Sequence, residues 1–193
     1  VALWLVSFGL GDNLLQATGL FVPGPETLSQ YWLAWALSVP LMLLVVATAC
    51  NAANLIDGMD GLCAGVLGII SVGFLILAVK LRTSPTVPHP VANLRIILAL
   101  SMLGASIGFL PFNRKPASIF LGDAGSMLLG RNAAILILLF AEENNARWML
   151  GAVMIFGLPL ADMVLTLGRR WRNARPAMEG DRSHFYDQLC DRG

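Results

Sequence analysis

The sequence predicts an all-α, polytopic integral membrane protein with about five transmembrane helices. Three observations lead to this class: 56% of the residues are hydrophobic, only 13% are charged, and several long apolar stretches follow one another. A soluble globular protein carries about 25% charged residues, so a water-soluble domain is excluded. The apolar fraction also excludes intrinsic disorder. The net charge of +1, without a basic run interleaved with aromatic residues, gives no indication of a nucleic-acid partner.

Each element follows from length and from the segments that separate the apolar stretches. A spanning helix needs about 20 mainly apolar residues. The stretches that qualify or come close are 28–50, 62–80, 91–111, 124–141 and 147–168. The first follows a P-G-P turn, and the third follows T-S-P-T-V-P-H-P. Polar segments close the others, and the chain turns polar after Trp171.

Consecutive crossings place the connections alternately on two sides of the membrane. One side holds segments 51–61, 112–123 and everything after 168. That side carries most of the basic residues: Arg114, Lys115, Arg169, Arg170, Arg172, Arg175, Arg182 and Arg192. The positive-inside rule therefore predicts that this side is cytoplasmic.

The first cytoplasmic loop reads N-A-A-N-L-I-D-G-M-D-G-L over residues 51–62. Four polar residues recur in it at every third position: Asn51, Asn54, Asp57 and Asp60. Groups three residues apart lie on neighbouring positions of a helix or a 3₁₀ turn, so the spacing predicts a polar stripe that ends in two carboxylates. Ordinary turn chemistry accounts for one or two of these residues, not for all four. We therefore interpret the loop as functional.

The second loop reads P-F-N-R-K-P-A-S-I-F-L-G-D-A-G-S over residues 111–126. Asp123 directly precedes the predicted helix 124–141 and would be a good N-cap for it. The alternative is that the glycines at 122 and 125 open the helix N-terminus to a phosphate, while Asp123 holds a Mg²⁺ ion that bridges to phosphate oxygens. A second acidic loop on the same face favours this alternative.

The third cytoplasmic segment, from residue 169 onward, holds arginines and His184. The arginines agree with the positive-inside rule or with contacts to anionic lipid heads. The chain has two histidines, and the other one, His89, is expected on the opposite side. On pattern alone, a single histidine is more often incidental than functional.

The acidic and histidine-bearing loops all fall on one face of the membrane, which favours an enzyme that joins a cytoplasmic substrate to a lipid one. Transporters place their charged sites near the midplane. Carboxylates beside glycine-rich helix starts indicate Mg²⁺ and phosphate chemistry, and H-E-x-x-H does not occur. The alternative class is a non-catalytic transporter or lipid-binding subunit, which a midplane polar stripe on several helices would favour.

Together, the motifs N-A-A-N-L-I-D-G-M-D-G-L, P-F-N-R-K-P-A-S-I-F-L-G-D-A-G-S, P-L-A-D-M-V-L-T-L-G-R-R and D-R-S-H resemble the polyprenyl-phosphate N-acetylhexosamine-1-phosphate transferases. The resemblance covers essentially the whole chain. The forms N-L-I-D-G-M-D-G-L and D-R-S-H look more like the N-acetylglucosamine-1-phosphate branch than the phospho-N-acetylmuramoyl-pentapeptide branch.

The resemblance implies a reaction between a nucleotide sugar and a lipid. A phosphate oxygen of undecaprenyl phosphate would attack the β-phosphate of a UDP-N-acetylhexosamine, UMP would leave, and a lipid-linked diphosphosugar would form. Mg²⁺, with Mn²⁺ as a substitute, would neutralise charge on the diphosphate. The sugar and the pathway (cell wall polymer, O-antigen or capsule) stay open.

The resemblance also implies roles for individual residues. Asp123 would be a Mg²⁺ ligand, and Asp57 and Asp60 would orient the nucleotide or the nucleophile, with the choice between base and covalent nucleophile left open. His184 matches the first histidine of the family's final motif and would bind the diphosphate. The substrate-binding residues would be Asn51, Asn54, Asn113 and Gly122.

Two departures from the family pattern stand out. Tyr186 and Asp187 occupy positions where family members often carry further histidines, and no aspartate pair precedes Asn51. We therefore expect residues 1–193 to be a single membrane-embedded catalytic domain cut at both ends and inactive alone, with 169–193 as a cytoplasmic loop. The expected location is the cell inner (plasma) membrane, multi-pass, with the active site on the cytoplasmic face. A homodimer is compatible with this prediction.

Overall fold

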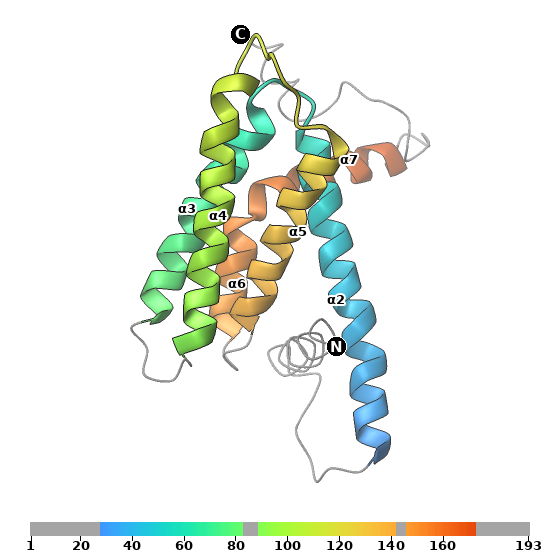
Figure 1. Cartoon of the computed structure of the whole chain (residues 1–193). Coiled ribbons are helices and arrows are strands. Elements are labelled where there is room, and N and C mark those ends of the chain that lie inside the picture. Colours follow the sequence, from blue (N-terminus) through green and yellow to red (C-terminus); the bar gives the residue numbers. More distant parts are fainter. Residues whose placement is uncertain (1–27, 83–88, 142–145, 173–193) are drawn as a thin grey trace.

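The computed structural model describes residues 28–82, 89–141 and 146–172, and every regular element in these ranges is an α-helix (Figure 1). No strand occurs in these residues, which confirms the all-α class. The helices are α2 (Leu28–Ile56), α3 (Leu62–Arg82), α4 (His89–Asn113), α5 (Gly122–Phe140), α6 (Ala146–Ile155) and α7 (Gly157–Arg172).

Four of these helices, α2 to α5, are long and apolar enough to cross a membrane, and the pair α6 and α7 makes a fifth span if it is taken as one unit. This agrees with the predicted number of about five. Large apolar side chains point outward along the spans, for example Ile69, which is 75% exposed, and Met154, which is 81% exposed. Contiguous exposed apolar surface on spanning helices is the surface that lipid covers.

The prediction of one continuous helix over 147–168 is wrong. This stretch is broken between α6 and α7, which are bent by 69° at Phe156. Pro159 supplies the reason, because it has no N–H to bond the carbonyl of Ile155, and in a straight helix its ring would clash with that carbonyl. α7 turns sideways across the bundle in Figure 1. It buries Asp162 and Thr166 on one face.

The first helix is longer than expected, because α2 continues through the two asparagines to Ile56 instead of ending near residue 50. Asn51 and Asn54 therefore lie on its last turns, while Asp57 and Asp60 lie in the turn that follows. α2 packs on α5 and α7, and α3 packs on α4. The main core lies between these helices and includes Leu67, Phe74 and Phe140.

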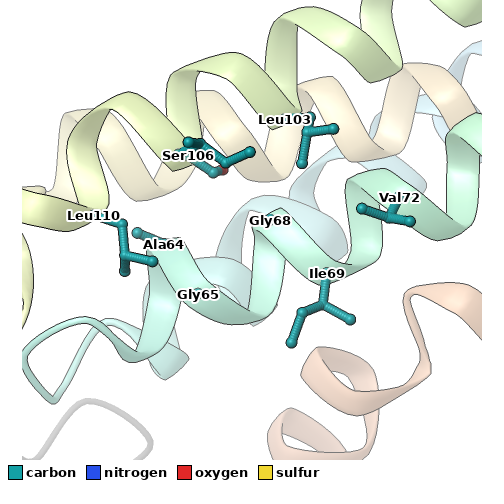
Figure 2. A pocket seen from close by; sticks show the side chains of 9 residues that line it. Ala64, Gly65, Gly68, Ile69, Val72, Leu103, Ser106 and Leu110 are labelled. Atoms are coloured by element: carbon teal, nitrogen blue, oxygen red, sulfur yellow. The ribbon is translucent and has the colours of Figure 1, made fainter.

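A groove of about 240 Å³ runs between α3 and α4 (Figure 2). Small residues of α3, Gly65 and Gly68 among them, line it together with Leu103 and Ser106 of α4. An ideal Cβ on Gly68 would contact the Ser106 Cβ at 3.4 Å. Glycine at this position therefore lets the two helices approach closely, as small residues do in membrane helix pairs.

Candidate active site

The two acidic loops meet at one end of the helix bundle. The turn between α2 and α3 and the loop between α4 and α5 lie at the upper end in Figure 1. Backbone and side-chain hydrogen bonds join them, although their residues are more than 50 positions apart in the sequence. The two loops, which the sequence predicts on one face of the membrane, are therefore joined at one end of the bundle.

Asn54 links the end of α2 to the start of α5. Its Nδ2 donates to Asp123 Oδ1 at 2.9 Å and to Ser126 Oγ at 3.1 Å. The Ser126 hydroxyl lies 3.0 Å from the Gly122 carbonyl oxygen, to which it can donate. Sequence reasoning left Ser126 out of the site, although its position three residues after Asp123 places both residues on one face of α5.

Asp123 is not the N-cap of its helix, which contradicts the capping interpretation. α5 begins at Gly122, so Asp123 lies inside the first turn, and the N-cap position is Leu121 without a side-chain hydrogen bond. A carboxylate in the first turn is still stabilised by the helix dipole. Because Asp123 is not used as a cap, its carboxylate is available for other partners.

Asp57 faces the start of α5 from the neighbouring loop. Burial raises the pKa of its carboxyl, and the negative charge of Asp123 raises it further. The backbone N–H of Gly122 hydrogen-bonds to the Asp57 carboxyl and opposes this increase. Gly122 itself has φ +64°, a conformation that favours glycine. Two carboxylates therefore lie near one exposed helix N-terminus.

The side chains of Asp60 and Asn113 form hydrogen bonds with backbone groups of the two loops. Asp60 Oδ2 accepts the N–H of Ala117 at 3.1 Å. Asn113 Oδ1 accepts the N–H of Gly61 at 3.1 Å, and its Nδ2 donates to the Ile119 carbonyl at 3.0 Å. Both side chains thus lie at the same end of the bundle as Asp57 and Asp123.

Asn51 is exposed, and its Nδ2 donates to the Ala47 carbonyl of its own helix at 2.8 Å. The structure brings it to the same end of the bundle as the acidic loops but gives it no hydrogen bond to the other loop among the described residues. His184, Tyr186 and Asp187 lie outside the described residues. Their roles stay predictions.

The donor set can accommodate Mg²⁺. No cluster of three or more His, Cys, Asp or Glu side chains occurs in the part of the chain that the structure describes. Mg²⁺ does not require one, because it keeps several waters and is usually held by one or two carboxylates together with substrate phosphates. Asp123 and Asp57 supply such carboxylate oxygens.

The fold and this site define a polytopic helical membrane protein with an acidic, phosphate-compatible site at one end of its bundle. The chain belongs to glycosyl transferase family 4, whose model matches residues 1–141.

Curated relatives agree with this assignment. A probable undecaprenyl-phosphate N-acetylglucosaminyl 1-phosphate transferase of Bacillus subtilis is 33% identical over 190 residues, which is 98% of this chain and 48% of that protein. A phospho-N-acetylmuramoyl-pentapeptide-transferase of Heliobacterium modesticaldum is 36% identical over 151 residues, which is 78% of this chain and 43% of that protein. The chain thus spans about half the length of these relatives.

Proposed function

We propose that the protein transfers a sugar-1-phosphate from a UDP-sugar to a polyprenyl phosphate, with release of UMP. The observation that carries this proposal is the meeting of Asp57, Asn54 and Asp123 at the start of α5. The family assignment supports it. The relative matched over 98% of the chain favours N-acetylglucosamine-1-phosphate as the transferred group.

The chemistry of such a transfer is mainly positioning and charge stabilisation. Asp123 and Asp57 would hold Mg²⁺, which when bound neutralises charge on the diphosphate. Asn54 fixes the Asp123 carboxylate through its Nδ2. The N-terminus of α5 has a favourable field for phosphate oxygens. Asn51, Asn113, Gly122 and His184 remain proposed contributors to substrate binding, and Asp60 remains proposed to orient the nucleotide or the nucleophile.

The proposed site lies on the cytoplasmic face of the cell membrane, where a UDP-sugar is available. The basic residues Arg114 and Lys115 next to the site support this orientation through the positive-inside rule. The lipid substrate would approach from the bilayer around the helices. The homodimer remains a prediction.

The experiment that tests the function measures UMP release from UDP-N-acetylglucosamine and undecaprenyl phosphate in membranes that carry the full-length gene product. We expect release to need both substrates and Mg²⁺, to stop with EDTA, and to return with Mg²⁺ or Mn²⁺. Asp123→Asn should lower the rate about 100-fold or more, the usual loss when one electrostatic group of a site is removed.

Arg82→Gln is the control, because Arg82 is an exposed charge at the opposite end of α3. It should leave the rate within about twofold, as surface changes usually do. If well-expressed protein releases no UMP from any of a panel of UDP-sugars, the transferase proposal is wrong. Release from another UDP-sugar would correct the choice of N-acetylglucosamine alone.

A further inference from the structure

The groove between α3 and α4 has a wall that offers almost no hydrogen-bonding group (Figure 2). Small and aliphatic residues form this wall, and its one polar side chain is Ser106. The Ser106 Oγ is buried and has no hydrogen-bond partner among the residues that the structure describes. An ordered water needs about two to four polar partners, so water does not fill the groove. The wall is therefore suited to hydrocarbon.

The groove opens on the surface that lipid covers. Ile69 and Ile107 line it and are 75% and 60% exposed. Along α4 the groove extends from Leu103 to Leu110, which is about 10 Å at 1.5 Å per residue. Both of its helices belong to the membrane-spanning set. A hydrocarbon chain of the bilayer can therefore enter the groove without crossing water.

Two basic residues lie just beyond one end of the groove. The apolar span of α4 ends at Asn113, and Arg114 and Lys115 follow it directly. The Arg114 N–H donates to the Leu110 carbonyl at 2.9 Å, so the basic pair begins one helical turn beyond the groove wall. Both side chains are exposed, and neither has an ion pair or a hydrogen bond within the described ranges. A phosphate headgroup at the end of the span would meet two cations.

We propose that this groove binds an anionic phospholipid of the bilayer. One acyl chain lies against Gly65 and Gly68, and the headgroup phosphate lies at Arg114 and Lys115. The hydrocarbon chain follows from a wall without polar partners, and the sign of the headgroup follows from the two cations. The site lies between α3 and α4, whereas the acidic site depends on the contact between α2 and α5, and the inference does not rest on the proposed function.

Photo-crosslinking of the full-length protein in lipid nanodiscs tests the site. The probes are phosphatidylglycerol and phosphatidylcholine, each with a diazirine in the upper half of one acyl chain, in discs of unlabelled phosphatidylcholine. The phosphatidylglycerol probe should label peptides covering 64–72 and 103–110 about fivefold more strongly or better, because attraction of an anionic lipid is worth about fivefold for each Lys or Arg near the surface. Equal labelling by the two probes would overturn the anionic-lipid site.

Gly65→Leu tests whether the acyl chain lies in the groove. An ideal Cβ at Gly65 meets nothing within 4 Å, so a larger side chain has room to enter the groove. Because a filled groove excludes the acyl chain sterically, labelling of both peptides should fall about tenfold. Gly104→Leu is the matched control, since Gly104 is exposed on α4, does not line the groove and has the same free space at its Cβ. Wild-type labelling of Gly65→Leu would overturn the proposal.

A charge variant keeps the test valid if Gly65→Leu fails to fold. Arg114→Gln combined with Lys115→Gln should bring the labelling ratio of the two probes down to about one, with labelling by phosphatidylcholine unchanged. Arg82→Gln, at an exposed arginine at the other end of α3, should keep the wild-type ratio. A wild-type ratio in the double variant would contradict the headgroup contact.

Competition separates a bilayer phospholipid from a polyprenyl phosphate, which also combines a phosphate with a hydrocarbon chain. Unlabelled phosphatidylglycerol should displace the phosphatidylglycerol probe from both peptides, whereas the same amount of undecaprenyl phosphate should not. Displacement by undecaprenyl phosphate at an equal or lower concentration would assign the groove to that lipid and overturn the proposal.

Discussion

Gly130 determines how closely α2 and α5 can approach. An ideal Cβ at this position would lie 2.6 Å from the Ala49 carbonyl oxygen and 2.8 Å from the Cys50 Cα. Both are backbone atoms of α2, so they cannot move aside as a flexible side chain would. One turn further along α2, Asn54 bonds Asp123 and Ser126. The glycine thus permits the crossing that forms the site.

Gly130→Ala should therefore push the two helices apart, destabilise the protein by about 1–3 kcal/mol and lower UMP release. Thermal unfolding in nanodiscs and the UMP assay measure the two effects. Gly104→Ala is the control, because Gly104 is exposed on α4 and an added Cβ would meet nothing within 4 Å. Equal stability and activity of the two variants would contradict this role of Gly130.

Single residues show what sequence pattern can and cannot identify in the site. The order of the predicted spans placed the loops that carry Asp57, Asp60 and Asp123 on one face of the membrane, and hydrogen bonds join these two loops in the fold. The same pattern missed Ser126, whose contact with Asn54 spans 72 positions. It also gave no signal that Asn113 bonds two backbones, since such contacts depend on loops brought together in space.

At the scale of elements, the end of α5 is held by α4 through a buried arginine. Arg95 is fully buried, and its Nε and Nη2 donate to the Leu139 carbonyl at 3.2 and 2.6 Å. Its guanidinium lies 5.3 Å from the centre of the Phe140 ring. The last carbonyls of a helix lack partners within it, and a cation there is favourable.

Arg95→Met should remove the two side-chain donors to the Leu139 carbonyl and lower the free energy of unfolding by about 1–3 kcal/mol. Arg95→Lys should recover part of the loss, because it keeps a donor and the charge but not the fork of the guanidinium. Thermal unfolding in nanodiscs checks both. Arg82→Met, an exposed cation at the end of α3, is the control, and an equal effect there would remove the helix-end explanation.

The broken span α6–α7 shows where hydropathy alone fails. Hydropathy averaged along the sequence predicts one helix over 147–168, because such an average is not affected by the missing backbone N–H of a single proline. Pro159 gives the local signal for the break, but the 69° bend depends on how α7 packs against α2. Asp162 and Thr166 are four residues apart and face inward, while Val164 and Leu165 are exposed.

At the scale of the whole molecule, the all-helical class and the number of membrane-spanning helices follow from the amino-acid composition and from the lengths of the apolar stretches. The arrangement of the helices does not follow from composition and length. Each predicted span is apolar on most of its faces, so the steric fit between individual side chains decides which helices pack together. Gly68 against Ser106 and Gly130 against Ala49 are examples of such fit. In a membrane, this packing replaces the hydrophobic drive that orders soluble helices.

The fold also makes a prediction about sidedness, because α3 carries the chain from the acidic loops to the opposite end of the bundle. In a full-length background from which every native cysteine has been removed, Lys115→Cys and Arg82→Cys introduce thiols at exposed positions at these two ends. In intact cells, a membrane-impermeant maleimide should label Arg82→Cys and leave Lys115→Cys unlabelled until the cells are opened. The reverse pattern would place the acidic site outside the cell, away from UDP-sugars. Labelling of both positions in intact cells would mean that α3 does not span the membrane.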